Sequence, residues 1–298
     1  MFGKKLKRGI AISPSFLSWV EVGGTSKEPA LAGSGVELLP EGLVNPSFAR
    51  ENIPDRSGMR EVLNKVVPVG KRSGLVSLTI PDAVLKISYL NFDELPKKRE
   101  EVERLILWRL KKNIPLAPEM AKVDYVICPP ANDSIDIIAA VASRKVLREY
   151  EDLLTDTGFK PNLVDILSMN LLNFFMEQLK GNYLFLAVND RSIAISVIEK
   201  GLVKLFRHKE MEIKEDRIIK EVFATVTYYK STFPESPVDS AYLFIETEKI
   251  QSKITERLSA SFDGNVSELN MAAALGRTGD TPIPGYCAAA IGGALRLK

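Results

Sequence analysis

The amino-acid sequence predicts an α/β protein built from two similar halves. Each half opens with a strand–turn–strand–turn–strand segment, at residues 9–38 and again at residues 183–206. Helical segments and short apolar strands then follow each of these openings. Repetition of a whole unit indicates duplicated α/β domains that face each other across a cleft. A chain of 298 residues, 45% hydrophobic and 26% charged, suits such an architecture.

The first half contains a predicted insertion between its last strands. A hairpin is expected at residues 9–22, because Ile10 and Ile12 alternate before the turn Ser13-Pro14-Ser15. The remaining elements follow from periodicity and from Gly and Pro signals. They are strands at 31–38, 75–80, 84–90, 123–128, 135–142 and 162–166, and helices at 59–66, within 95–113, at 145–157 and at 169–179. Gly158 is expected to end the third helix and Ser168 to cap the fourth.

The second half repeats this pattern in a shorter form. Strands are predicted at 183–188, 192–198, 202–206 and 240–245, and helices at 215–233 and 248–258, with a closing segment at 288–297. The strand at 135–142 is nearly all apolar, so we expect both of its faces to be buried.

The segment from Arg99 to Asn132 organises the predicted insertion. Its helix places five apolar residues on one face (Val102, Leu105, Ile106, Leu110 and Ile114). Trp108 falls on the opposite face, among Arg104, Lys111 and Lys112. Two interpretations are open for this tryptophan: a neighbouring subdomain covers it, or it is an anchor for a binding partner.

Composition excludes several functional classes. The formal net charge is only +2, so we expect no nucleic-acid partner. No apolar run reaches the roughly 18 residues of a membrane span, and no apolar h-region precedes Gly9, so a cytoplasmic protein is expected. Two cysteines and one histidine exclude a disulfide framework and a Cys/His zinc cluster. His208 is expected to be a surface residue. Basic runs at 4–8 and 97–99 are typical of solvated surface, with anionic lipid as the alternative contact.

Four collinear segments of the chain resemble the PilM family of type IV pilus assembly proteins. The first is Trp108 to Tyr125, which is similar to the family's tryptophan, Ile-Pro and Asp-Tyr pattern. The others are Ala142 to Lys145 with Leu153 to Ile166, then Ala224 to Tyr242, then Ala288 to Arg296. More distantly, the chain resembles FtsA and the cytoplasmic part of the secretion protein GspL.

The resemblance implies a duplicated actin/Hsp70-like (ribonuclease H-like) fold. The first actin-like half would span residues 1–181 as subdomain 1A, with an FtsA/PilM-type subdomain 1C inserted at about 82–162. The second half would span residues 182–298, with a reduced subdomain 2B and a C-terminal segment returning to 1A.

The same resemblance implies a scaffold that is peripheral to the inner membrane through its partner. That partner would be a bitopic, PilN-like protein whose cytoplasmic tail docks between 1A and 1C, alongside other pilus or secretion components of the inner membrane. Candidate tail contacts are Val84, Ile87, Tyr89, Trp108, Arg109, Ile114 and Leu116. Arg109 stands where the family more often has an acid, which indicates a divergent partner tail. The basic N-terminus supplies few charges, so membrane contact is expected to be indirect.

The nucleotide motifs of that superfamily are altered at three places. The first hairpin has Ala11-Ile12-Ser13-Pro14 where the family has Asp-Ile-Gly-Ser, so an acid and a backbone donor are lost. The second hairpin has Val188 to Arg191 where Asp-Ile-Gly-Ala is expected, or, in another register, Asn189 at the acid position. Glu246-Thr247-Glu248 replaces the glycines beside adenosine. We therefore expect a pseudo-ATPase: no enzyme, no catalytic or metal-binding residue, and no ATP or Mg²⁺ cofactor.

Two alternatives remain at the level of the sequence. One is an actin-like ATPase whose remodelled phosphate site uses Ser13 and Asp190 to bind Mg-ATP. The other is a GspL-like cytoplasmic module of type II secretion. No Walker P-loop, GxSxG, HExxH or CxxC motif indicates other chemistry.

Overall fold

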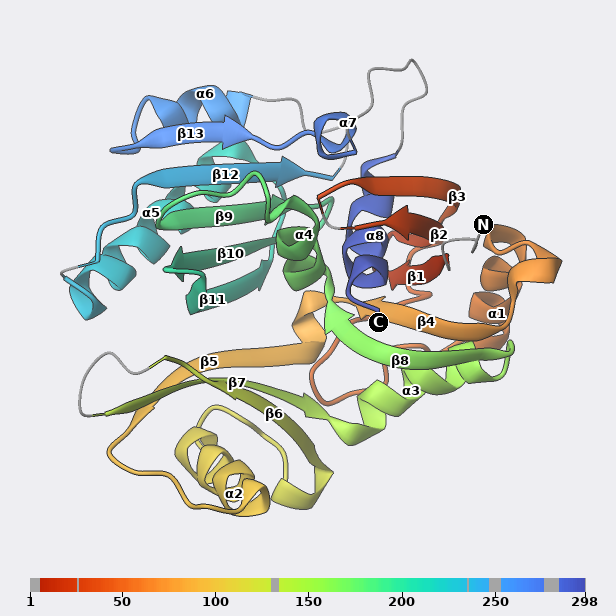
Figure 1. Ribbon diagram of the computed structural model, residues 1–298, viewed down its shortest axis with the longest axis horizontal. Coiled ribbons are helices and arrows are strands. Elements are labelled where there is room, and N and C mark those ends of the chain that lie inside the picture. The colour runs from red at the N-terminus through yellow and green to blue at the C-terminus, as the bar shows by residue number, and fades with distance from the viewer. Residues whose placement is uncertain are drawn as a thin grey trace.

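The computed structural model describes residues 6–25, 27–129, 134–234, 236–246, 253–275 and 284–297. Two five-stranded sheets and one three-stranded sheet organise these residues (Figure 1). The predicted α/β class is therefore confirmed.

The first large sheet has the strand order β3-β2-β1-β4-β8. The first three strands form an antiparallel meander, and β4 and β8 join β1 in parallel. Both faces of β2 are buried, because Val20 packs in one core cluster and Trp19 in another. Helices α1 and α3 pack on this sheet. The insertion therefore ends with β7 at Ser143 and not at about residue 162 as expected, because α3 and β8 both belong to the first sheet. The bounds are β1 (Lys7–Ile12), β2 (Phe16–Gly24), β3 (Pro29–Leu38), α1 (Arg56–Val66), β4 (Gly74–Ile80), α3 (Arg144–Thr155) and β8 (Phe159–Ile166).

The second large sheet repeats this topology in the order β11-β10-β9-β12-β13. Helices α5 and α6 pack together on one face of this second sheet and share a core cluster with it. The four-residue strand β13 was not predicted, because it is short and mostly polar. The bounds are β9 (Tyr183–Val188), β10 (Ser192–Glu199), β11 (Leu202–Glu210), α5 (Glu215–Thr232), β12 (Ser240–Ile245), α6 (Lys253–Ser259) and β13 (Asn265–Glu268). The predicted start of the helix at 248 lies outside the described residues.

Two helices, α4 (Leu167–Phe175) and α8 (Ala288–Leu295), pack against each other between the large sheets (Figure 1). A Cβ atom built on Gly292 would lie 1.9 Å from the carbonyl oxygen of Asn170, and one on Gly9 would lie 2.1 Å from that of Ala290. Only glycine permits such close contact between main chains. Helix α8 also contacts β1, β2 and β4, so the last described segment of the chain packs on the first sheet.

The small sheet has the order β5-β7-β6 and is antiparallel. Helix α2 covers one face of it, on the side away from the large sheets (Figure 1). Only that face of β7 is fully buried: Ile137, Ala139 and Val141 are 0% exposed, whereas Ile138 and Ala140 are half-buried. The prediction that both faces of this strand are buried was therefore wrong, because one helix covers a single face. The bounds are β5 (Leu85–Phe92), α2 (Arg99–Leu110), β6 (Ala121–Ile127) and β7 (Ile135–Ser143).

The two predicted helix signals had different outcomes. Gly158 follows α3 with a φ of +98°, as expected for a residue that ends a helix. Ser168 does not cap α4; it lies within the first turn, and its N–H and hydroxyl donate to Asp82.

Short elements complete the fold: the 3₁₀ turns η1 (Val69–Lys71), η2 (Asp82–Val84), η3 (Pro118–Met120) and η4 (Gly285–Cys287), and helix α7 (Met271–Ala274). Among the described residues, no helix has the length and apolar character needed to cross a membrane.

Candidate functional site

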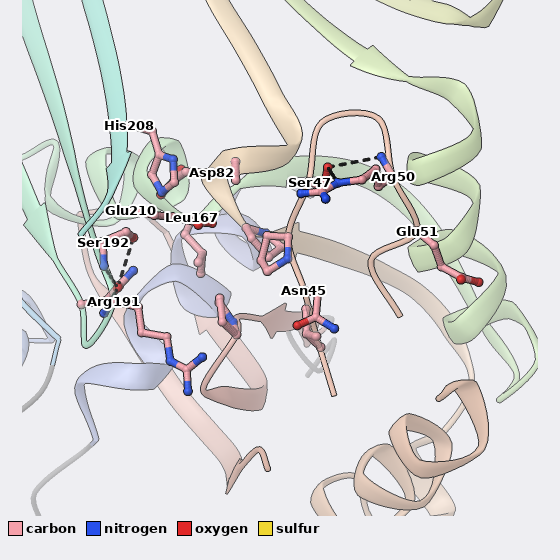
Figure 2. A pocket seen from close by; sticks show the side chains of 16 residues that line it. Asn45, Ser47, Arg50, Glu51, Asp82, Leu167, Arg191, Ser192, His208 and Glu210 are labelled. Carbon is pink, nitrogen blue, oxygen red and sulfur yellow. Dashed lines mark hydrogen bonds between the residues drawn. The ribbon is translucent and has the colours of Figure 1, made fainter. Parts of the chain in front are cut away.

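A pocket of about 400 Å³ lies in the cleft between the two halves (Figure 2). The β1–β2 turn contributes Pro14, and the β9–β10 turn contributes Asn189, Arg191 and Ser192. The loop at residues 44–51 closes another side of the pocket. The remaining lining residues come from η2, α4 and β11, and they are Pro81, Asp82, Ala83, Leu167, His208 and Glu210. The two turns that the resemblance assigns to phosphate binding therefore do meet at one pocket.

The β1–β2 turn uses its own donors internally. The Oγ atom of Ser13 accepts the N–H groups of Ser15 and Phe16, each at 3.1 Å. The N–H of Ser13 donates to the carbonyl oxygen of Phe16 at 2.9 Å, and Pro14 has no N–H to offer. The Ser13 side chain therefore already accepts the N–H groups of this turn, in the way that a bound ligand oxygen would.

The β9–β10 turn is closed in the same way by Asn189. Its Oδ1 atom accepts from the N–H of Arg191 at 2.9 Å, and from the N–H and hydroxyl of Ser192 at 2.8 and 3.1 Å. The Arg191 guanidinium pairs with Glu41 at 3.3 Å. Asp190 does not line the pocket. The residues at the two turns thus do not fit a phosphate cradle built from free N–H groups.

Two buried acids lie behind the turns. Asp82 is 4% exposed and accepts from the N–H and hydroxyl of Ser168 at 3.0 and 2.6 Å. Burial raises the pKa of Asp82, although the charge of His208 and the bonds from Ser168 act against this. Burial also raises the pKa of Glu246 well above its usual range, and the charges of Asp82 and Asp190 add to the effect. Asp82 lines the pocket, whereas Glu246 lines only a small cavity behind it.

The space beside these acids is small. A second cavity, lined by Asp82, Val188, Asn189 and Glu246 among others, has a volume of about 10 Å³. That volume holds about one water molecule. Three residues were expected to replace the adenosine glycines. The main chain of Glu246 lies close to Gly285, where an added Cβ would be 2.7 Å from the Glu246 carbonyl oxygen, and residues 247 and 248 lie outside the described part. His208, which was expected at the surface, is half-buried and lines the pocket beside Asp82 (Figure 2).

The seven predicted tail contacts do not form one surface. Val84 and Ile114 are buried at 0% and 5% exposure, and Leu116 packs against the core under α2. Ile87 packs against the core of the first half. Val84 and Ile114 therefore support neighbouring elements and offer no surface to a partner in this conformation.

Tyr89 is engaged within the chain. Its hydroxyl accepts from the Lys204 Nζ at 2.5 Å, and its ring lies 5.9 Å from that of Phe233, edge to face. These contacts join β5 of the insertion to β11 and to the end of α5.

Trp108 and Arg109 are exposed at the end of α2, Trp108 to 61%. The interpretation that a neighbouring subdomain covers Trp108 is therefore wrong, because α2 lies on the outer face of its sheet (Figure 1).

A second hollow, of about 490 Å³, separates the first half from the insertion. Helices α1 and α3 form one wall, and η3 forms the other. Its lining residues are Arg56, Glu119, Met120, Arg144, Lys145, Arg148, Glu149 and Asp152. Sequence reasoning did not single out these residues. Arg144, Arg148 and Asp152 are spaced by four residues on the polar face of a predicted helix. This spacing predicts that they lie on one side of the helix, and so it could have identified one wall of the hollow.

Comparison with known proteins gives similarity in structure alone. No protein-family model matches this chain, and no curated protein matches it in sequence. A chain of a PilM–PilN type IV pilus biogenesis complex has a TM-score of 0.80 at 15% identity, with 99% of each chain covered. The cytoplasmic domain of EpsL, an inner-membrane component of the type II secretion system of Vibrio cholerae, has a TM-score of 0.55 at 10% identity, over 91% of this chain and 92% of that one.

A protein of unknown function from Bacteroides thetaiotaomicron, described as having an actin-like ATPase fold, covers 89% of this chain and 91% of its own. Its TM-score is 0.53 and its identity 14%. Together with the repeated strand order of the two large sheets, these similarities show that the chain has the actin-like ATPase fold, in a form that resembles the PilM–PilN complex chain over nearly its whole length.

Proposed function

We propose that this protein is a non-catalytic scaffold at the cytoplasmic face of the inner membrane, in a type IV pilus or related secretion apparatus. It binds the cytoplasmic tail of a PilN-like bitopic protein and is held at the membrane through that tail. The observation that carries the proposal is the structural match over 99% of both chains, insertion included, to a chain of the PilM–PilN complex.

The closure of both turns supports a role without nucleotide chemistry. In an actin-like ATPase, free N–H groups at these turns would meet phosphates, and acids would organise a metal. Here Ser13 and Asn189 take up the turn donors, and Ala11 replaces the first acid. The carboxyl group of Asp82 also lines the pocket and is already hydrogen-bonded to Ser168, so it offers no free donor to a phosphate.

The hollow between α3 and η3 is the surface that suits the tail. It lies between the first half and the insertion, where the resemblance implies that the tail docks. Four bases and three acids line it, and Met120, which is 44% exposed, supplies an apolar contact. An extended peptide with charged residues around an apolar one matches that chemistry.

Titration of Mg-ATP into the purified protein, followed by calorimetry, tests the non-catalytic part. No heat of binding up to millimolar nucleotide is expected. Micromolar binding would instead support the alternative ATPase with a phosphate site rebuilt around Ser13 and Asp190.

Titration of synthetic PilN-like tail peptides tests the scaffold part. We expect binding that falls at least tenfold in the double variant Arg144→Glu/Arg148→Glu, because both charges face the hollow. The matched control is Lys220→Glu/Lys230→Glu on the exposed side of α5, which should bind the peptide normally. Equal binding by both double variants would contradict the assignment of the hollow.

A GspL-like cytoplasmic module of type II secretion is the second candidate, favoured by the similarity to the EpsL domain. Under this alternative, peptides from the inner-membrane components of a type II system would bind in place of the PilN-like tails.

A further inference from the structure

The two ends of α2 use their basic residues differently. At the first end, Arg99 pairs with Glu103 at 3.0 Å and with Asp124 at 2.6 Å, and Lys98 lies 3.9 Å from Glu101. From the middle of α2 to just beyond its last residue, four exposed bases make no ion pair with any described residue; they are Arg104, Arg109, Lys111 and Lys112. No acidic residue occurs between positions 104 and 118 of the sequence. The positive charge of this end is therefore not neutralised within the described chain.

Trp108 lies in the middle of this basic group. It is 61% exposed, and the Nζ atom of Lys111 lies 5.6 Å from its ring centroid. Residues 104, 108 and 111 follow one another at helical spacing, so a single face presents the ring together with the charges. We call this group, which comprises Arg104, Trp108, Arg109, Lys111 and Lys112, the α2 basic face.

Contacts within the protein do not account for the α2 basic face. The opposite side of α2 already fills the core of the insertion through Val102, Ile106 and Leu110. Neither Trp108 nor Arg109 lines the hollow assigned to the partner tail. A helix C-terminus favours a nearby base through its dipole, but that effect is confined to the last turn and does not require an exposed indole.

We propose that the α2 basic face lies on the surface of an anionic lipid bilayer. Trp side chains favour the headgroup level of a membrane, where the ring is partly desolvated and the N–H stays wet. Lys and Arg around the ring meet the anionic headgroups while their methylene stems cover apolar surface. Helix α2 lies at the outer boundary of the molecule, so a flat surface can reach it (Figure 1).

This contact is weak by itself and adds to the tail. Each base near an anionic surface contributes roughly a fivefold gain in partitioning. With the tail bound, the face would act at high effective concentration and would fix which side of the protein meets the membrane. The inference goes beyond the proposed tail binding and does not depend on it, because bare vesicles carry no partner.

The test uses the full chain and vesicles of phosphatidylcholine, with and without phosphatidylglycerol. The protein has two tryptophans, and Trp19 is only 3% exposed, so a change in emission on binding reports Trp108. With anionic vesicles we expect a blue shift and co-sedimentation, both reversed by salt. Lys111→Glu/Lys112→Glu should lower partitioning more than about twentyfold. Trp108→Ala should lower it and abolish the blue shift.

Two matched controls make the test specific. Lys220→Glu/Lys230→Glu changes the same number of charges on α5, and Tyr228→Ala removes a ring that is 57% exposed there. Both controls should partition like the unchanged protein. Equal losses in the controls, or anionic vesicles that leave Trp108 emission unshifted, would overturn the proposal. A shift caused by a tail peptide but not by vesicles would also overturn it, and would assign Trp108 to the tail. Tail binding by the Lys111→Glu/Lys112→Glu variant should be normal, which separates the two proposals.

Discussion

The two halves of this protein share one strand order but differ in what is added to it. In the first half, a complete sheet and helix stand between β4 and α3, whereas in the second half only residues 246–252 separate β12 from α6. The last strand of the first half has eight residues, and that of the second half has four. The strand order that both halves share therefore forms the two sides of the cleft, and the insertion adds surfaces that the second half lacks.

The two central helices also differ, and in a complementary way. Helix α4 presents large side chains such as Phe174 and Phe175, and α8 presents alanines and glycines. The small side chains of α8 allow its main chain to lie close to that of α4, and the large side chains of α4 fill the space around this contact. The two halves meet at this contact, so we expect substitutions there to lower the free energy of unfolding more than substitutions elsewhere.

The largest effect is expected from Gly292→Ala. The added Cβ would lie 1.9 Å from a main-chain oxygen of α4, which cannot move aside as a side chain would. We expect a loss of about 3 kcal/mol in the free energy of unfolding, at the upper end of overpacking effects. Urea denaturation measures it. Gly70→Ala is the control, because a Cβ there would meet nothing within 4 Å. Equal stability of the two variants would show that α4 and α8 are not in close contact.

The next effect concerns Glu246, the buried acid of the second half. Its pKa is raised in the folded state, so the native protein binds the proton more tightly than the unfolded chain does. The stability that this group contributes is present below pH 4.5 and is lost as the pH rises through the raised pKa.

The variant Glu246→Gln cannot titrate. At pH 8 it should therefore be more stable than the unchanged protein, by on the order of 1–2 kcal/mol. The difference should shrink as the pH falls toward 4.5. Unfolding by urea from pH 4.5 to 8 checks this, with the exposed Glu210→Gln as the control. A difference that grows at low pH would refute the sign.

A third prediction compares the two turns directly. Asn189→Ala leaves three donors without their acceptor, and Ser13→Ala leaves two. We expect losses of about 1.5 and about 1 kcal/mol, measured by thermal unfolding. Neither variant should gain binding of Mg-ATP, because Ala11 still stands in place of an acid and Pro14 still has no N–H to donate. A larger loss of stability for Ser13→Ala than for Asn189→Ala would contradict this ranking, and would mean that the Ser13 side chain stabilises its turn more than Asn189 does.

The smallest effect is expected where the insertion meets the second half. Tyr89→Phe removes the bond from Lys204 and keeps the ring against Phe233. A loss of about 0.5–1 kcal/mol is expected, with faster hydrogen exchange in β5 and β11. Tyr228→Phe, at an exposed ring, should change neither quantity. Unchanged exchange in Tyr89→Phe would show that this bond does not hold the insertion in place.

Local patterns in the sequence were sufficient for the repeated frame. Strand β12 was predicted with its observed bounds, and β9 likewise, because a short apolar run between turn signals depends only on adjacent residues. The actin-like fold followed from a resemblance that the structural comparisons confirm. The expectation that nucleotide is not bound came from single residues such as Ala11 and Pro14, and it stays a prediction.

Only the tertiary structure decided which side chains meet. Ser168 appears in the sequence as a helix cap, yet it donates to Asp82, which lies 86 positions away. The lining of the hollow at α3 joins residues from 56 to 152, and the exposure of Trp108 depends on which face of a sheet α2 covers. Periodicity records the burial of each element along the chain. It does not record contacts between distant elements, because those depend on how the sheets and helices pack in three dimensions.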